Sequence, residues 1–278
     1  MVKLDVHILG ISCGHRKNRN TSWLVQYALK AAEKFGRRVS DVVNLTTDFE
    51  DLADKNIKPC LNCDERWEIP NLGLPYKGTE MPKPRGCIIK NDYMKVLWPK
   101  IEKADGFIFG SPVYTLSYSS KFRLLTERFA HGIWQPGHLS GKPVGAVTTA
   151  TMPIGGQESC LMDMNNVLRA VEMIPVSWVF GAPGVSGPPY GPLPDGDDGH
   201  LIGQKKHRYG NWLAILVGRR VAEFAVMLKI AKGELGDLYK KEFLQILHPP
   251  HGDESWAWEK LDSDDEEYMQ NIIGGEEK

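Results

Sequence analysis

The sequence predicts a doubly wound α/β domain: a parallel sheet of five strands in the order 2-1-3-4-5, with helices on both faces. Three observations support this fold class. Short strand-like segments alternate along the chain with longer segments of helical spacing, which is the pattern of a parallel sheet. The chain has 278 residues, enough for one large domain. Its composition, 42% hydrophobic and 25% charged, is that of an ordinary globular protein and excludes a disordered chain, a collagen and a coiled coil.

Strands are expected where apolar residues alternate with polar ones, or form short runs that end at Gly, Ser or Pro. The first segment alternates in this way and ends in a polar loop. The five expected strands are Val2–Ile11, Val39–Leu45, Gly106–Gly110, Val144–Thr149 and Val176–Phe180. Five strand–helix units in about 230 residues fit the flavodoxin-like order of a doubly wound sheet.

Helices are expected where apolar residues recur every three or four positions. The residues with this spacing form four groups: Leu24, Ala28, Ala31 and Phe35; Met94, Leu97, Trp98, Ile101 and Ala104; Phe122, Leu125 and Phe129; Leu161, Met164, Leu168 and Val171. Gly36 is expected to end the first helix, and Asn91 or Asp92 lies near the N-terminal cap of the second. A long closing helix is expected over about Gly210–Lys232.

One domain is expected over residues 1–235, because no internal repeat or second apolar core is visible. Two segments rich in Pro and Gly, Asp64–Gly86 and Gly181–Tyr209, are expected to be long loop insertions in this domain. Residues 236–278 then form an extension, which we interpret as a partly disordered, solubilising tail. From residue 252 onward this tail has ten Asp and Glu against two Lys, so the remainder of the chain is mildly basic.

The composition also restricts the location and the partners. No apolar run approaches the roughly 18 to 20 residues that span a bilayer, and the N-terminus has no cleavable apolar segment, so we expect a cytoplasmic protein without membrane contact. Five cysteines are an odd, sparse set, unlike a secreted disulfide framework. No basic stripe on a recognised module is visible, so no nucleic acid is expected, and an anionic small molecule suits the basic body better.

The order 2-1-3-4-5 places a ligand beyond the carboxyl ends of strands 1 and 3. The loop after the first strand, Ser12–Thr21, has hydroxyls, amides and three cations and leads into a helix N-terminus, which favours a phosphate. It matches neither a Gly-x-Gly-x-x-Gly nor a Walker motif, and the second strand is expected to end at Asn44, without an acid for a ribose hydroxyl. A mononucleotide phosphate fits best; the alternative is a polar loop that only caps the helix.

The loop after the third strand, with the sequence Gly-Ser-Pro-Val-Tyr, ends at Tyr114. Pro112 fixes the turn, the backbone groups of the next two residues are expected to be available, and the tyrosine offers a flat face. This suits a planar heteroaromatic ring; the alternative is a tight turn with a core tyrosine. In the loop Thr149–Gln157, Gly155 and Gly156 would let backbone approach the edge of such a ring.

Six segments carry a family resemblance, in this order along the chain: Gly10–Ser22, Ile57–Cys63, Cys87–Asp92, Ala104–Tyr114, Gly155–Glu158 and Gly218–Glu223. Together they resemble NAD(P)H-dependent FMN reductases and the related iron-sulfur flavoproteins over about residues 3–232. The resemblance implies a flavodoxin-like fold with bound FMN. It assigns the FMN phosphate to Ser12, Arg16, Asn18, Asn20, Thr21 and Ser22, and the isoalloxazine ring to Ser111, Pro112, Val113, Tyr114, Thr149, Gly155 and Gly156.

The resemblance also implies an activity. Hydride would pass from NAD(P)H to FMN and then, in a ping-pong cycle, to a quinone, an azo or nitro compound, a flavin or another small organic acceptor. Because the hydride step needs no side-chain acid or base, no catalytic residue is named. Tyr114 and Gln157 are expected only to have a binding role. A homodimer or homotetramer is implied, and Trp67, Tyr76 and Tyr190 in the enlarged loops favour a defined pocket or a subunit interface. The alternatives are an electron-transfer flavoprotein of the iron-sulfur type, without its own organic substrate, and a binding module that has lost FMN.

Two features depart from the family pattern. The phosphate loop is one residue longer than usual and includes His15, whose role the sequence leaves open. Cys60, Cys63 and Cys87 match three of the four thiolates of the iron-sulfur relatives, but Arg66 stands at the position of the other one. Because a cubane cluster normally needs four thiolates, we expect no cluster and no metal, and interpret the three cysteines as reduced structural remnants.

Overall fold

The computed structural model describes residues 3–61, 87–129, 139–177, 181–185 and 207–239. The strands are β1 (Leu4–Ser12), β2 (Val43–Asp51), β3 (Gly106–Pro112), β4 (Pro143–Ala150), β5 (Ile174–Pro175) and β6 (Ala182–Val185). The helices are α1 (Asn20–Arg38), α2 (Met94–Lys103), α3 (Ser120–Glu127), α5 (Gln157–Ala170) and α6 (Arg208–Leu235). The strands pair in parallel in the order β2-β1-β3-β4-β5, with β6 also paired to β4, which confirms the predicted flavodoxin-like fold.

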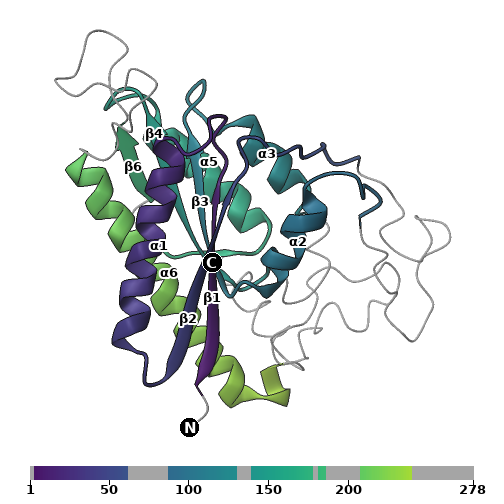
Figure 1. Cartoon of the computed structure of the whole chain (residues 1–278), viewed down its shortest axis with the longest axis vertical. Helices are drawn as coiled ribbons and strands as arrows, with labels where there is room; N and C mark the ends of the chain where they lie inside the picture. The colour runs from purple at the N-terminus through teal and green to yellow at the C-terminus, as the bar shows by residue number, and fades with distance from the viewer. Residues whose placement is uncertain (1–2, 62–86, 130–138, 178–180, 186–206, 240–278) are drawn as a thin grey trace, which may run out of the picture.

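Helices cover both faces of the sheet, α1 and α6 on one side and α2, α3 and α5 on the other (Figure 1). Successive residues of β1 supply the two cores in turn, since side chains alternate across a strand. Val6 and Ile8 pack into the cluster with α1 and α6, whereas Leu9 and Ile11 pack into the cluster with the other three helices. All four side chains are fully buried, so the central strands are apolar on both faces.

The end of α1 and the bounds of β2 differ from the prediction. Gly36 does not end α1, which continues to Arg38. The glycine instead allows close packing on β2, since a Cβ at Gly36 would lie 2.7 Å from the Leu45 Cβ. The strand expected over Val39–Leu45 begins at Val43 and continues to Asp51. The expectation that β2 ends without an acid was therefore wrong, and Asp51 lies at its carboxyl end.

The far edge of the sheet is also different. A fifth strand was expected over Val176–Phe180, but two shorter strands pair with β4 at this edge, β5 with its start and β6 with its end. Because β6 lies in the expected insertion Gly181–Tyr209, that segment is not all loop. The whole of the expected insertion Asp64–Gly86 lies outside the described residues, as do residues 178–180, 186–206 and 240–278.

The described part of the chain contains no helix that is both long and apolar enough to cross a membrane. The last helix of the described residues, α6, ends at Leu235. The division into a domain and an acidic extension stays a prediction.

Candidate functional site

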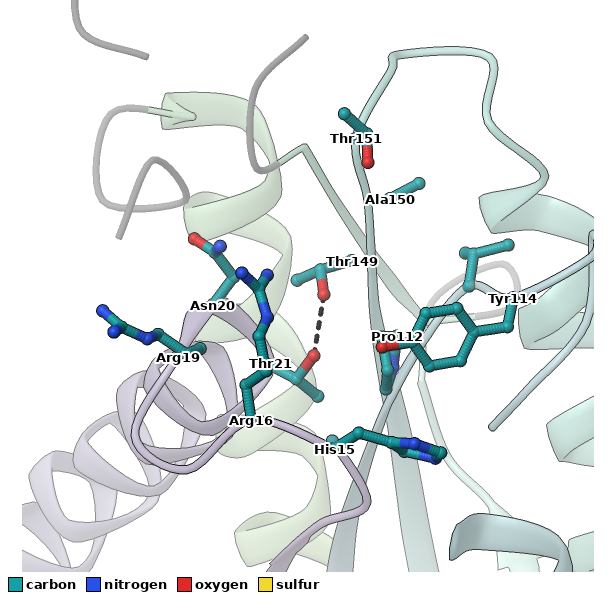
Figure 2. Close-up of a pocket in the computed structure, with 12 residues that line it drawn as sticks. His15, Arg16, Arg19, Asn20, Thr21, Pro112, Tyr114, Thr149, Ala150 and Thr151 are labelled. Atoms are coloured by element: carbon teal, nitrogen blue, oxygen red, sulfur yellow. Dashed lines mark hydrogen bonds between the residues drawn. The ribbon is translucent and has the colours of Figure 1, made fainter. Parts of the chain in front are cut away.

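A pocket lies at the carboxyl ends of β1, β3 and β4, where the strand order reverses (Figure 2). Its walls come from the loop after β1, the first turn of α1, the loop after β3 and the residues after β4. The lining residues are Gly14, His15, Arg16, Arg19, Asn20, Thr21, Pro112, Val113, Tyr114, Thr149, Ala150 and Thr151. Seven of the thirteen residues assigned to the cofactor by resemblance are thus brought together in one place.

One side of the pocket is formed by cations and a helix N-terminus. Arg16 and Arg19 come from the loop, and Asn20 and Thr21 begin α1. The first turn of α1 has no acidic residue, and none of the described lining residues is a carboxylate. The positive end of the helix dipole and two guanidinium groups together favour a phosphate at this position. Arg19 was not predicted, although its place directly before the helix is a signal that could have identified it.

Thr21 and Thr149 connect the two halves of the pocket. Their hydroxyl oxygens are 2.8 Å apart, and both residues are buried (Figure 2). This hydrogen bond fixes the start of α1 against the end of β4, two elements far apart in the sequence. The cationic side of the pocket is therefore held at a set position relative to the residues after β4.

The other side of the pocket carries an aromatic ring at a tight turn. The backbone N–H of Tyr114 donates to the Ser117 carbonyl over 2.9 Å, and Thr115 and Leu116 between them have φ angles of +50° and +63°. Both non-glycine residues are in the left-handed region, a strained conformation that the surrounding structure must hold. The turn leaves Tyr114 46% exposed at the pocket, as a flat wall.

The backbone donors expected in this loop are already engaged. The N–H of Val113 donates to the Thr149 carbonyl over 2.8 Å, and that of Tyr114 closes the turn. The expectation that the backbone groups of these two residues are available was wrong for both N–H groups, because the tight turn and the pairing with β4 use them. The loop presents an apolar and aromatic surface to the pocket.

His15 lies in the pocket wall beside Tyr114, with the ring centroids 5.2 Å apart in an edge-on arrangement. Its Nε2 is 3.1 Å from the hydroxyl of Ser120, at the start of α3. The additional residue of the loop therefore brings a hydrogen-bonded imidazole against the aromatic wall.

Three residues assigned to the phosphate do not line the pocket. The hydroxyls of Ser12 and Ser22 are buried and 3.1 Å apart, and Ser22 donates to Oδ2 of Asp51 over 2.6 Å. Asn18 also bonds to Asp51, through its backbone N–H. These groups stabilise the loop from its outer side, and the sequence does not show which hydroxyl faces which side.

Three residues assigned to the ring also lie outside the pocket lining. The Ser111 hydroxyl accepts from the Ser119 N–H over 2.8 Å and is buried. The Gly155 N–H donates to Oε1 of Gln157 over 2.8 Å. Gly156 caps α5 with a φ of +89°, and a Cβ there would lie 2.8 Å from Leu116 Cδ2, so glycine lets the turn after β3 approach α5.

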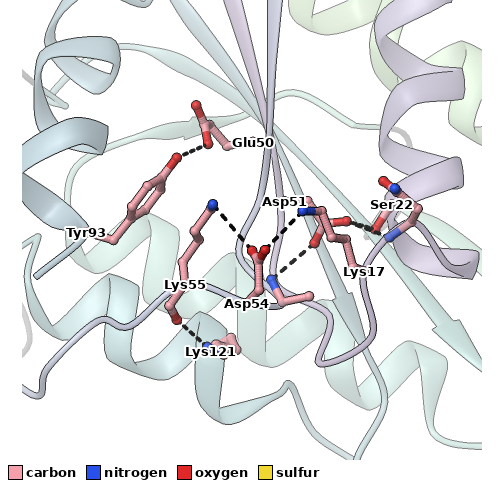
Figure 3. Close-up of polar contacts among 10 residues, drawn as sticks. Lys17, Ser22, Glu50, Asp51, Asp54, Lys55, Tyr93 and Lys121 are labelled. Carbon is pink, nitrogen blue, oxygen red and sulfur yellow. Dashed lines mark hydrogen bonds and ion pairs between the residues drawn. The ribbon is translucent and has the colours of Figure 1, made fainter.

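Beyond the phosphate side of the loop lies a group of carboxylates and lysines (Figure 3). Lys17 and Asp54 are 3.0 Å apart, and this contact raises the pKa of Lys17 and lowers the pKa of Asp54. The Tyr93 hydroxyl donates to Glu50 over 2.7 Å; burial, with a further contribution from that carboxylate, raises the pKa of Tyr93 to about 12. Of these contacts, the Lys17–Asp54 pair is the one that involves the loop, and it lies on the exposed side of the loop.

The four described cysteines lie in two kinds of surroundings. Cys13 and Cys160 are fully buried in the apolar core, and burial raises the pKa of the Cys160 thiol to about 11. Cys60 and Cys87 are half-buried, and Cys63 lies outside the described residues. Of the three cysteines that match the iron-sulfur pattern, only Cys60 and Cys87 are therefore described, whereas a cubane cluster normally needs four thiolates. Among the described residues no group of three His, Cys, Asp or Glu could hold a metal ion.

A buried ion pair holds the cysteine-bearing segments. The guanidinium of Arg128 pairs with Asp92, and both side chains are almost completely buried. Arg128 also donates to the Lys58 carbonyl over 3.1 Å and to Cys87 Sγ over 3.0 Å. One arginine therefore connects the end of α3, the segment before Cys60 and the segment that begins at Cys87.

The fold and the pocket together define a flavodoxin-like α/β protein with a pocket at the switch point of its sheet. The sequence profile of the NADPH-dependent FMN reductase family matches residues 6–185, and the chain belongs to that family.

Known proteins similar to the chain include archaeal flavoproteins. An iron-sulfur flavoprotein of Methanocaldococcus jannaschii is 32% identical over 170 residues, which cover 61% of this chain and 75% of the relative. One of Archaeoglobus fulgidus is 28% identical over 173 residues, covering 62% and 67%. Among solved structures, RosB with bound 8-demethyl-8-formylriboflavin-5'-phosphate aligns with a TM-score of 0.57, 16% identity, and 90% and 92% of the two chains covered. At that identity the likeness shows the fold.

Proposed function

We propose that the protein is an FMN-dependent oxidoreductase that takes electrons from NAD(P)H and passes them to a small organic acceptor. The observation that carries the proposal is the pocket at the switch point, in which a cationic helix N-terminus stands opposite a flat aromatic wall. A flavin mononucleotide has a phosphate at one end and a planar ring at the other, which are the two chemistries that this pocket offers. Membership of the FMN reductase family supports the same ligand.

In this proposal the phosphate is bound by Arg16, Arg19, Asn20 and Thr21, together with the first N–H groups of α1. The guanidinium groups neutralise the phosphate charge, and the helix N-terminus supplies directed donors. Ser12, Asn18 and Ser22 are part of the same loop but act behind it. The Thr21–Thr149 hydrogen bond fixes the phosphate side relative to the ring side.

The ring is bound in this proposal against Tyr114, Pro112 and Val113. Their apolar surface excludes water from one side of a planar ligand, and the strained turn after Tyr114 holds the aromatic ring in place. When bound, FMN supplies the hydride chemistry, so the chain needs no acid or base of its own for that step. The residues of the chain bind and orient the cofactor and leave room for the nicotinamide and the acceptor.

The names of the relatives raise the alternative of an electron-transfer flavoprotein with an iron-sulfur cluster. The donor set of this chain does not fit such a cluster, which favours the reductase. We also propose a homodimer or homotetramer in the cytoplasm. The exposed apolar side chains Leu116 and Ile154, which are 64% and 93% exposed, support self-association.

Steady-state kinetics test the reductase proposal. We expect NADPH or NADH oxidation to continue over many turnovers when a quinone such as menadione or free flavin is supplied, with parallel lines in double-reciprocal plots of the two substrates. Parallel lines are expected because the two substrates use the same pocket in turn. The FMN-loaded protein without acceptor, under argon, is the control. If each FMN consumed only one NADPH or NADH and no acceptor supported further turnover, the result would favour the electron carrier.

A further inference from the structure

We infer that Asp51, at the carboxyl end of β2, is a positioning residue that holds the phosphate-binding loop in shape and so lets the protein distinguish FMN from riboflavin (Figure 3). The inference rests on the proposed function, because it concerns the same loop. Asp51 does not line the pocket. It acts through residues that flank the side chains lining the pocket.

The carboxylate of Asp51 is buried and accepts three hydrogen bonds. Its Oδ2 accepts from the backbone N–H of Asn18 over 2.8 Å and from the hydroxyl of Ser22 over 2.6 Å. Its Oδ1 accepts from the Ala53 N–H over 3.1 Å, which fixes the orientation of the carboxylate. Hydrogen bonds to an ionised acceptor are about twice as strong as neutral ones, so these contacts hold the loop firmly.

The two loop contacts of Asp51 lie on either side of the residues that face the pocket. Asn18 lies between Arg16 and Arg19, and Ser22 directly follows Thr21. Asn18 has a φ of +53°, a left-handed conformation that a residue with a Cβ adopts only when other contacts hold it. One buried carboxylate therefore fixes both the strained turn of the loop and the first turn of α1.

A second carboxylate contacts the same loop and provides a matched control. Asp54 pairs with Lys17 over 3.0 Å, but the two side chains are 46% and 57% exposed. Exposed ion pairs of this kind contribute little, since both ends are solvated and mobile. Asp51 and Asp54 thus have the same charge and the same neighbourhood, and only the first is buried and bonded to the backbone of the loop.

We expect Asp51 to affect only the part of the flavin affinity that comes from the phosphate. The aromatic wall belongs to β3 and its following turn, and within the described part of the chain no hydrogen bond joins Tyr114 to Asp51, Asn18 or Ser22. A loop that is already in its binding conformation loses less freedom on binding, so its ordering increases affinity only for a ligand that contacts it. FMN and riboflavin differ only in the phosphate group, which is the part expected to contact this loop.

The test compares the dissociation constants of FMN and riboflavin for the full-length protein after flavin removal, measured by quenching of flavin fluorescence. We expect Asp51→Asn to weaken FMN binding about tenfold, in keeping with the loss of a charge-assisted hydrogen bond. Riboflavin binding should change less than about twofold. Ser22→Ala should show a smaller loss of the same kind, and Asp54→Asn should leave both constants unchanged.

Equal losses for the two flavins, or no loss of FMN affinity, would overturn the inference. So would tighter FMN binding by Asp51→Asn, which is the result expected if the carboxylate only repelled the phosphate. If Asp51→Asn fails to fold, the test is the same comparison of the FMN and riboflavin dissociation constants for Ser22→Ala. A wild-type protein that binds both flavins equally would instead contradict the proposed phosphate site, so the two failures are distinguishable.

Discussion

Replacement of Arg16 by Ala and Thr21 by Val in one chain is expected to leave a folded protein that binds FMN about a hundredfold more weakly. The change removes a cation and a hydroxyl from the phosphate side of the pocket. A charge-assisted hydrogen bond contributes about 1.5–3 kcal/mol and a neutral one about 1 kcal/mol, and the sum corresponds to roughly two orders of magnitude in affinity. The measurement is an equilibrium titration of flavin-free protein with FMN.

Lys17→Ala is the matched control for the double variant. Lys17 is a cation of the same loop, but it does not line the pocket and pairs with Asp54 on the outer side. We expect its FMN affinity to stay within about threefold of the wild type. Circular dichroism checks the fold, since the loss of the Thr21–Thr149 hydrogen bond costs some stability. Unchanged FMN affinity in the double variant would contradict the assignment of this loop.

Arg128→Met is expected to lower the free energy of unfolding by about 3–5 kcal/mol. The variant would leave the Asp92 carboxylate charged and buried without its partner, since the Asp92 side chain has no exposed surface. It would also remove the bonds that connect α3 to the Lys58 carbonyl and to Cys87. The measurement is denaturant unfolding of wild type and variant under identical conditions.

Arg123→Ala is the control for this prediction. Arg123 is on the same helix and pairs with Glu127 at 3.1 Å, but its side chain is 58% exposed. We expect a change within about 0.5 kcal/mol, as for other exposed pairs. If Arg128→Met were no less stable than Arg123→Ala, the buried pair would not be what holds the cysteine-bearing segments.

The central strands could be predicted from the sequence, and the edges of the sheet could not be placed well. β1, β3 and β4 are buried on both faces and consist largely of apolar residues, so their position is evident. β2 pairs only with β1 among the described strands and has mostly polar, partly exposed residues, so no apolar pattern marks its bounds. β5 has only two residues and is set by its pairing with β4.

The position of the site was predictable to a similar degree. The rule for the switch point identifies the loops after β1 and β3, and the pocket lies between them. What the sequence cannot show is the direction of each polar group. The hydroxyls of Ser12, Ser22 and Ser111 are used within the protein, and Asp51 could not be found while β2 was expected to end at Asn44.

The absorption spectrum of the purified full-length protein, recorded before and after anaerobic addition of NADPH, tests the central claim most directly. The released chromophore and the iron are quantified on the same sample. The account predicts a two-banded flavin spectrum that bleaches with NADPH, FMN as the released chromophore, and no stoichiometric iron. A colourless protein that cannot take up FMN would contradict the account, and stoichiometric iron with a broad brown shoulder would contradict the conclusion drawn from its cysteines.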